Sequence, residues 1–331
     1  SITEKPVLVC RDGNVTWVPK GFRKSCHESE TMDFQSKTCY NIPECSFIGG
    51  IMKRSDGVLL KSLDPFVQII PYIMEKRSDA QNFSKHVVCA DPIDSYIREK
   101  REQGVKISYL HFFIAAYVRL ISERPQLNRF IINRRIYQRN NICVSMAIKR
   151  SLRDDEDEET TVKFEFTGKE NIFEVIEIID KLIAEAKAYD SKTDTDRLVA
   201  MVMSMPGIVK KILVKILKGL DQINLLPQTV IKASPFHTTL FFTYLKSIHT
   251  NYIYHHLYDF GTTGLFVALG KTVKLPMVVD DQVVVKKCCQ IGYTMDERIC
   301  DGLYFAKSFK LLERYIENPH LLETGAKEKS S

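Results

Sequence analysis

Long uninterrupted apolar runs are missing from this chain of 331 residues. A membrane-spanning helix needs about 18 or more consecutive apolar residues, whereas the most apolar region, residues 198–220, contains four lysines. A spanning helix is therefore not expected. The start of the sequence has neither a basic stretch followed by an apolar core nor a small-residue cleavage site. Because nothing there indicates secretion, we expect a cytoplasmic protein.

Strong charge of one sign is also lacking. The formal net charge is +6, the basic residues are spread along the chain, and the one dense block of charge, residues 154–159, is acidic. Nucleic-acid binding normally needs clustered Lys and Arg, so no nucleic-acid partner is expected. With 44% hydrophobic residues, the chain can bury one domain of about 200 to 250 residues beside an appended segment.

Cysteine pairs with metal-site spacing are absent. Cys10, Cys26, Cys39 and Cys45 are separated by fifteen, twelve and five residues, which matches no C-x-x-C arrangement, so no metal site is expected. The later cysteines lie mostly in apolar or strand-like runs and are interpreted as buried, reduced and structural. Residues 1–51 lack clear periodicity and carry the only tryptophan. They are interpreted as an appended segment of unknown role.

Regular periodicity predicts a main domain over residues 52–325, followed by a disordered tail at 326–331. A hairpin is predicted over 131–148, with its turn at Asn140 and Asn141. Strands and helices in mixed order predict an α/β or two-layer α+β fold. Helices are predicted over 65–76, 92–103, 108–123, from Asn171 to about Ala186, over 198–220 and over 303–316, and strands at VKFEF, TLFFTYL, GLFVALG, QVVVKK and CQIGYT.

Residues 198–220 admit two interpretations beyond being helical with a break at Pro206. The first, which we favour, is a helical insertion packed on the core. The second is an amphipathic element lying on an anionic membrane surface, which the mixture of lysines and apolar residues permits. The sequence leaves both open.

A turn of sequence DERICDG, residues 296–302, follows the last predicted strand and leads into the last predicted helix. The segment around it resembles the C-terminal end of the dihydrolipoyl acyltransferases of 2-oxo acid dehydrogenase complexes and of chloramphenicol acetyltransferases, whose pattern there is H-x-x-x-D-G. The segment ISYLHFFIAAYVRLISERPQLN is similar to the buried helix of that family, and TLFFTYLKSI is similar to its central strand. The resemblance spans most of residues 60–322 and implies a chloramphenicol acetyltransferase-like fold, a mixed sheet with flanking helices.

The resemblance also implies a chemistry. In that family a histidine is the general base for the thiol of coenzyme A or dihydrolipoamide, the thiolate attacks an acyl thioester, and a Ser or Thr hydroxyl stabilises the oxyanion. Carried over, the histidine position is Glu297, the aspartate is Asp301, and the hydroxyl falls at Thr243, although the asparagine and glycine expected beside it are replaced. A thiol with pKa near 8.5 and a glutamate near 4.3 differ by about four units, so proton transfer to Glu297 is uphill by roughly 6 kcal/mol unless burial raises its pKa.

Each candidate has an ordinary structural interpretation as well. Asp301 precedes a glycine at a helix start and can simply cap that helix, and Thr243 suits a strand by propensity alone. His255 and His256 form a second candidate base, because His255 and Asp259 repeat the H-x-x-x-D spacing before a glycine. Both histidines can equally be hydrogen-bonded turn or interface residues.

Two functions follow from the resemblance. The first is an acyltransferase that uses coenzyme A as acyl-CoA substrate and works as a homotrimer, because the family places its active site between subunits. The second is a catalytically inactive family member that serves as an oligomeric scaffold or binds a ligand. No lipoyl-bearing or subunit-binding domain is evident before Met52, so the chain does not read as a complete dehydrogenase-complex acyltransferase.

Overall fold

The computed structural model describes residues 7–11, 14–18, 54–149, 159–188 and 193–326. The chain divides into two compact units, residues 1–46 and 47–331. The first unit contains strands β1 (Val7–Arg11) and β2 (Asn14–Val18), which pair antiparallel. Three of the four early cysteines, and nearly all of the predicted tail, lie outside the described residues. The predicted boundary near residue 51 stays a prediction.

The second unit is built on a six-stranded mixed sheet in the order β4-β11-β10-β9-β7-β8. Strand β9 is parallel to both of its neighbours, β7 and β10, and the other pairs are antiparallel. A separate three-stranded sheet has the order β3-β6-β5. The strands are β3 (Gly57–Leu59), β4 (Gln81–Cys89), β5 (Arg129–Ile132), β6 (Arg135–Arg139), β7 (Ile142–Lys149), β8 (Glu159–Phe166), β9 (Leu240–Tyr244), β10 (Leu265–Val279) and β11 (Gln282–Asp296).

The predicted helices are all present, with ends shifted by a few residues. They begin where side chains satisfy the free backbone N–H groups: Ser108 and His111 form a capping box on α3, and Asn171 and Glu174 form the predicted one on α4. The helices are α1 (Pro65–Ile73), α2 (Asp91–Glu102), α3 (Tyr109–Glu123), α4 (Ile172–Lys187), α5 (Asp194–Met203), α6 (Gly207–Gln222), α7 (Gln228–Ala233) and α8 (Gly302–Glu317), with short 3-10 helices η1 (Ser78–Ala80), η2 (Pro125–Asn128), η3 (Leu245–Ile248) and η4 (Pro319–Leu322).

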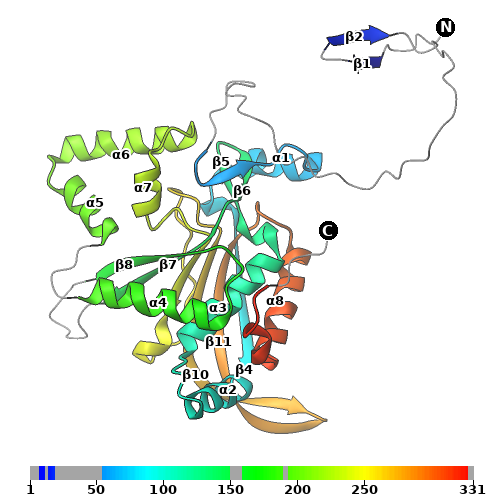
Figure 1. Cartoon of the computed structure of the whole chain (residues 1–331), viewed down its shortest axis with the longest axis vertical. Coiled ribbons are helices and arrows are strands. Elements are labelled where there is room, and N and C mark those ends of the chain that lie inside the picture. Colours follow the sequence, from blue (N-terminus) through cyan, green and yellow to red (C-terminus); the bar gives the residue numbers. More distant parts are fainter. Residues whose placement is uncertain (1–6, 12–13, 19–53, 150–158, 189–192, 327–331) are drawn as a thin grey trace. The chain divides into compact units, whose positions relative to one another are not determined.

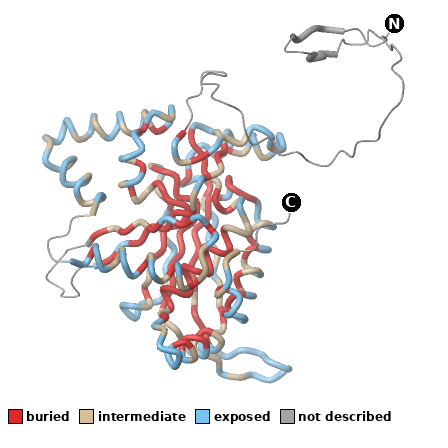
Figure 2. The backbone as a smooth tube through the Cα atoms, viewed as in Figure 1, coloured by how far each residue is buried: buried red, intermediate tan, exposed pale blue. Residues whose placement is uncertain are grey.

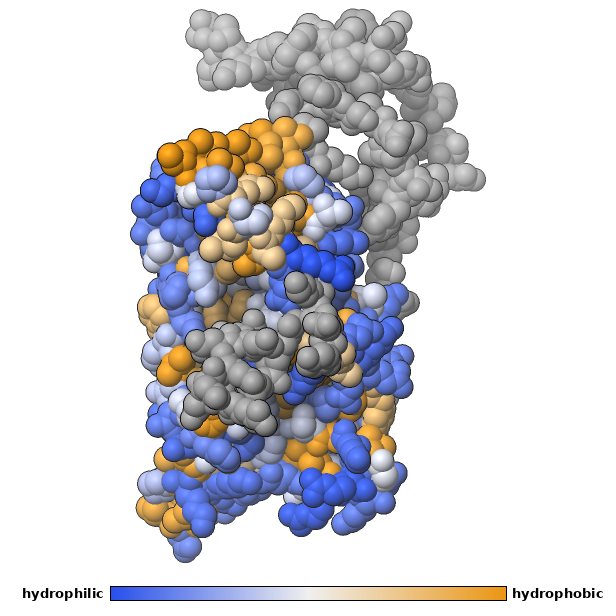
Figure 3. Space-filling view, turned by 90° about the vertical axis from the view of Figure 1, so that its left-hand side faces the viewer, coloured by the Kyte–Doolittle hydropathy of each residue, from blue (hydrophilic) through white to orange (hydrophobic). Residues whose placement is uncertain are grey.

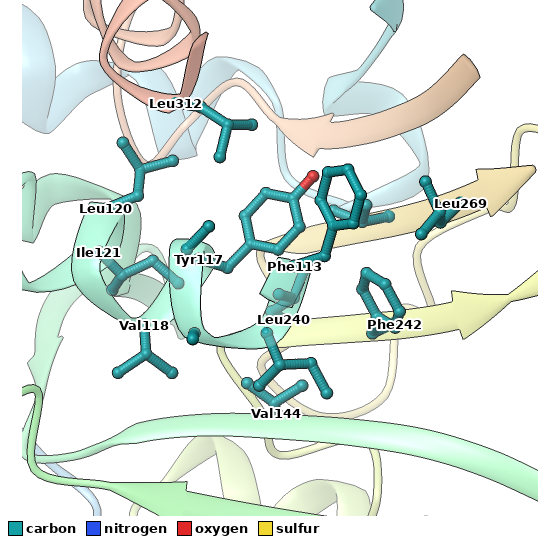
Figure 4. Packing of buried hydrophobic residues seen from close by; sticks show 14 of the residues in the cluster. Phe113, Tyr117, Val118, Leu120, Ile121, Val144, Leu240, Phe242, Leu269 and Leu312 are labelled. Atoms are coloured by element: carbon teal, nitrogen blue, oxygen red, sulfur yellow. The ribbon is translucent and has the colours of Figure 1, made fainter. Parts of the chain in front are cut away.

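Helices α2, α3, α4 and α8 cover one face of the large sheet, and the main core lies between these two layers (Figures 1 and 2). Helix α3 is the most deeply buried, as its many apolar positions predict. Figure 4 shows Tyr117 beside Phe113 on this helix, and its ring lies 6.1 Å between centroids from that of Phe242 on β9. The Tyr117 hydroxyl also meets the hydroxyl of Tyr293 on β11 at 2.6 Å. The expected mixed sheet with flanking helices is therefore confirmed.

The hairpin predicted over 131–148 is wrong. Strand β6 pairs with β5 and β3, whereas β7 pairs with β8 and β9 in the other sheet. The true hairpin joins β5 to β6, and its turn residues Asn133 and Arg134 both have positive φ, at 46° and 58°. Positive φ at both central residues is what a tight two-residue hairpin requires. Asn140 and Asn141 instead carry the chain from one sheet to the next.

The loop at residues 249–264 crosses the face of the large sheet opposite the helices. It approaches the sheet closely because two sheet residues have no side chain. A Cβ on Gly270 would lie 2.3 Å from the Tyr252 nitrogen, and one on Gly292 would lie 2.6 Å from the Ile253 oxygen. This loop is called the covering loop below.

The 198–220 region is helical with the predicted break, but the favoured packing on the core does not hold. Helix α5 has no buried residue, and the only one in α6 is Asp221, just beyond the region. No helix in the described ranges is long and apolar enough to cross a membrane. The cysteines of the second unit are free, and all except the half-buried Cys89 are buried, as predicted.

Candidate active site

The turn between β11 and α8 is held by an ion pair inside the protein. Arg298 donates to both carboxylate oxygens of Asp296, each at 2.8 Å, and also donates to the Met74 and Glu75 carbonyls at 3.2 and 3.0 Å. Arg77 approaches the same carboxylate to 3.4 Å. Asp296 and Arg298 are 1% and 4% exposed. Two such buried, mutually paired groups fix the shape of the turn.

Glu297 lies between the two paired residues and points outward. Its side chain is exposed and accepts a hydrogen bond from Asn82 Nδ2 on β4 at 2.8 Å, while its backbone N–H donates to the Ala80 carbonyl at 2.9 Å. The neighbouring Arg298 is hydrogen-bonded to Asp296 and not to Glu297. The burial that would make Glu297 a better base is therefore not provided by the single chain.

Asp301 has the capping geometry. Its carboxylate accepts from the Tyr304 backbone N–H at 2.7 Å, which makes it the N-cap of α8. A negative charge at this end also interacts favourably with the helix dipole. The side chain is exposed and holds the start of the helix.

Thr243 is half-buried near the end of β9, opposite Ala268 of β10. Side chains alternate between the two faces of a strand, so Thr243 shares a face with Phe241 and not with Phe242, which faces α3. Phe241 stacks on Phe266 with ring centroids 4.9 Å apart. Thr243 therefore lies on the face that the covering loop crosses.

His255 is on the covering loop and lies over the same face. Its ring stacks on Phe266 at 4.2 Å between centroids, and its backbone carbonyl accepts from the Thr294 hydroxyl. The Nε2 atom is shielded from solvent and has no hydrogen-bond partner. Burial, and then the neighbouring His256, lower the pKa of His255 below its usual value. A histidine with a lowered pKa is neutral at physiological pH, which is the form that accepts a proton.

The other members of the predicted motif point elsewhere. His256 is exposed and packs edge-on against Tyr258 at 4.9 Å. Asp259 accepts from the backbone N–H of Ser78 at 3.0 Å and faces its hydroxyl at 3.3 Å. The H-x-x-x-D spacing is thus not a histidine–aspartate pair. Among the described residues, no hydrogen bond or ion pair joins Glu297 to Thr243, His255 or His256.

A buried polar network around His237, beside the covering loop, was not predicted from the sequence. His237, which is fully buried, meets the Ser234 hydroxyl through Nδ1 at 2.8 Å and Asp221 through Nε2 at 3.2 Å. Arg54 pairs with the same aspartate at 2.7 Å. The arrangement resembles a serine–histidine–aspartate triad, but Ser234 is 3% exposed and the aspartate is shared with an arginine. The network anchors the ends of α6 and α7, and only the three-residue spacing of Ser234 and His237 was visible in the sequence.

A cavity of about 310 Å³ opens beside the turn. Asp259 and Gly261 of the covering loop line it on one side, and Arg298 lines it on another. Its wall also includes Lys76, Arg77 and Arg134, together with Glu75, which pairs with Arg134. Within the described ranges, no group of three or more His, Cys, Asp or Glu residues could hold a metal ion.

Residues 264–324, which include the turn, match the family of 2-oxoacid dehydrogenases acyltransferase (catalytic domain). The second unit is similar to the cubic core of the pyruvate dehydrogenase multienzyme complex, with a TM-score of 0.52 and 10% identity over 80% of this chain and 93% of that one. The fold is that of the acyltransferase catalytic domain of 2-oxoacid dehydrogenases. No curated protein matches the chain in sequence.

Two dihydrolipoamide acetyltransferase structures can be compared with this chain in the same way. The dihydrolipoamide acetyltransferase of Azotobacter vinelandii gives a TM-score of 0.50 at 10% identity, covering 79% of this chain and 93% of that one. A serine, a histidine and an asparagine four positions after it were investigated for their role in the catalytic mechanism of that enzyme. A probable dihydrolipoamide acetyltransferase from Listeria monocytogenes is 18% identical, with a TM-score of 0.49 over 82% of this chain and 96% of that one.

Proposed function

We propose that the chain is an acyltransferase that moves an acyl group between coenzyme A and a thiol or other small acceptor through a thioester. The observation that carries this is the placement of His255, with a free and shielded Nε2, on the sheet face that also holds Thr243. These two residues offer a base and a hydroxyl. Glu297 occupies the position of the family histidine but is exposed, so we assign the base to His255.

The reaction then proceeds by proton transfer and addition. His255 Nε2 takes the proton of the attacking thiol, and the thiolate adds to the carbonyl carbon of the acyl thioester. The Thr243 hydroxyl donates to the oxyanion of the tetrahedral intermediate. Collapse of the intermediate breaks the original carbon–sulfur bond, and the departing thiolate recovers the proton from the imidazolium. Because Nε2 is shielded, the thiol reaches it after the covering loop has moved.

Coenzyme A carries several phosphate charges, and the basic cavity beside the turn suits them. Lys76, Arg77, Arg134 and Arg298 line it, with Arg77 and Arg298 already paired with Asp296 and Arg134 in contact with Glu75. Arginine in particular matches the geometry of phosphate oxygens. We assign this cavity to the nucleotide end of the acyl-CoA substrate, with the covering loop lying between it and Thr243.

A homotrimer, as the resemblance implies, agrees with the surface next to Glu297. Phe83, the neighbour of Asn82, is 56% exposed and packs edge-on against Tyr254, which is 46% exposed. Aromatic residues are enriched at protein interfaces. A second subunit seated here would cover the Glu297–Asn82 pair and supply burial that one chain lacks.

The second candidate is an inactive family member that acts as an oligomeric scaffold or binds a ligand. Two properties of Glu297 favour it. The side chain is exposed, and its carboxylate accepts a hydrogen bond from Asn82, so it is not positioned as a buried base. Such a protein would form a stable oligomer without turning over acyl-CoA.

Calorimetry with coenzyme A tests the proposal at its first step. We expect the native chain to bind coenzyme A, and Arg134→Ala to weaken binding by about tenfold, the effect of losing roughly 1.4 kcal/mol of charge-assisted contact. Lys307→Ala, on the exposed side of α8, is the matched control and leaves binding unchanged. Absence of binding to the native chain would falsify the acyltransferase function.

A further inference from the structure

Helices α5 and α6 follow one another in the chain, and the two outer ends of this α5–α6 segment are fixed to the rest of the unit. At the start of α5, Thr195 donates to the Ala233 carbonyl at 2.7 Å, and Asp196 accepts from the Thr160 hydroxyl at 2.9 Å. At the end of α6, Asp221 is held by Arg54 and His237, as described above. Between these anchors, no residue of either helix is buried. The α5–α6 segment is therefore held at both ends while most of its surface is exposed to solvent.

One row of α6 is apolar and strongly exposed. Ile208, Ile212 and Ile216 follow one another at four-residue spacing and are 76%, 53% and 51% exposed. Residues at that spacing lie on one side of a helix. Leu213 and Leu217 lie on another side of the helix and are half-buried, so the isoleucine row is its more exposed side.

Helix α5 adds to this surface. Met201 and Met203, at its C-terminal end, are 54% and 60% exposed. Figure 3 shows an apolar area at the top of the molecular face on which the α5–α6 segment lies. Contiguous exposed apolar surface of this kind normally marks a binding surface for a protein or a membrane.

A row of lysines runs beside the isoleucines. Lys211, Lys215 and Lys218 are three and four residues apart, which places them together on the adjoining side of α6. Residues 198–220 contain four lysines and no Asp or Glu. A partner that matches this surface therefore has an apolar region for the isoleucines and negative charge beside it for the lysines.

We propose that the α5–α6 segment docks on the surface of an anionic lipid bilayer. The isoleucine row enters the boundary between headgroups and acyl chains, and the lysine row meets the negatively charged headgroups. Helix α6 has 16 residues and a length of about 24 Å, which it lays in the plane of the interface. The docking is of the peripheral kind, in agreement with the lack of any spanning helix in the described ranges.

A second copy of the chain fits this surface less well. In a two-fold interface the same patch meets itself, so the lysine rows of the two copies would lie near each other with no Asp or Glu of residues 198–220 between them. Like charges brought together oppose association. An anionic membrane satisfies the apolar row and the lysine row at once.

Vesicle co-sedimentation of the full chain tests the docking, independently of any acyl-transfer activity. We expect binding to vesicles of phosphatidylcholine with 30% phosphatidylserine (roughly −30 to −50 mV at the surface), weaker binding as NaCl is raised, and little binding to phosphatidylcholine alone. The variant carrying Lys210→Glu, Lys211→Glu, Lys215→Glu and Lys218→Glu should bind the anionic vesicles at least about tenfold more weakly, because each lysine near the surface contributes about 1 kcal/mol.

The matched control makes the same charge change on exposed lysines of α4 and α8. It carries Lys181→Glu, Lys187→Glu, Lys307→Glu and Lys310→Glu, and it should keep the native binding. The variant with Ile208→Ser, Ile212→Ser and Ile216→Ser should lose binding while keeping its urea midpoint, since all three side chains are more than half exposed.

Three outcomes would overturn the docking. The first is absence of native binding to the anionic vesicles, and the second is equal binding to both vesicle types. The third comes from sedimentation velocity: if the isoleucine variant forms a smaller oligomer than the native chain, a second copy occupies this surface.

Discussion

Asp296 and Arg298 form a bidentate ion pair inside the protein, and Glu297 between them points out to Asn82. The pair holds the shape of the turn while leaving the Glu297 side chain exposed. It also separates two properties of the turn. Its geometry depends on the buried residues on either side, and the side chain between them is free to vary without disturbing that geometry.

Removing the buried carboxylate should destabilise the fold. Asp296→Asn leaves Arg298 and the nearby Arg77 without their negative partner, and breaking a buried pair in this way costs about 3 to 5 kcal/mol. We expect the urea midpoint to fall accordingly. The control is Glu297→Gln, one residue along and exposed, which should change the free energy of unfolding by less than about 0.5 kcal/mol. Equal effects of the two variants would contradict this assignment.

The capping role of Asp301 can be separated from chemistry. Asp301→Ala should cost about 1 kcal/mol of stability, because the Tyr304 backbone N–H loses its acceptor. Asp301→Asn should preserve stability, since asparagine caps helices equally well. If Asp301→Asn abolishes acyl transfer while thermal unfolding is unchanged, the carboxylate takes part in the reaction and capping is not its only role.

The close approach of the covering loop depends on two glycines. Gly292→Ala should push the loop off the sheet, because the new methyl group would meet the Ile253 carbonyl at 2.6 Å. We expect a loss of about 1 to 3 kcal/mol and faster proteolysis within residues 249–264. Gly219→Ala is the control, with nothing within 4 Å of the new atom, and should stabilise α6 by up to about 1 kcal/mol. A protected loop in Gly292→Ala would rule out this packing.

The buried network predicts how stability depends on pH. Burial, more than any other cause, lowers the pKa of His237 in the folded chain, and pairing with Asp221 only partly opposes this. Because the folded-state pKa lies below the unfolded value of about 6.5, the unfolded chain takes up the proton first, and stability falls as the pH drops below about 6.5. We expect His237→Gln to reduce the slope of unfolding free energy against pH between about 7 and 5. An unchanged slope, with exposed His249→Gln as control, would contradict it.

Local signals in the sequence were sufficient for much of the fold. Ser108 and Asn171 mark helix starts by chemistry that acts within three residues, and both helices begin there. The hairpin failed because its turn was placed at Asn140, while the residues with positive φ are Asn133 and Arg134. Arginine carries no turn signal of its own, so tertiary pairing decided the register.

The candidate site was only partly visible for a similar reason. The DERICDG turn is local and was found, with Asp301 as the helix cap. The ion pair between Arg54 and Asp221 joins residues 167 positions apart, and no periodicity announces it. Likewise, the spacing of His255 and Asp259 suggested that the two side chains pair. In the structure Asp259 accepts a hydrogen bond from the Ser78 backbone N–H instead. Which face a loop covers follows from packing, not from spacing.

The most direct test is the rate of acyl transfer from acetyl-CoA to dihydrolipoamide by the native chain, measured beside His255→Gln and Glu297→His. We expect measurable transfer by the native chain and a loss of about 100-fold or more in His255→Gln, the usual contribution of a general base. His256→Gln should be close to native. If transfer is absent from the native chain and appears only in Glu297→His, His255 is not the base and the protein is an inactive scaffold.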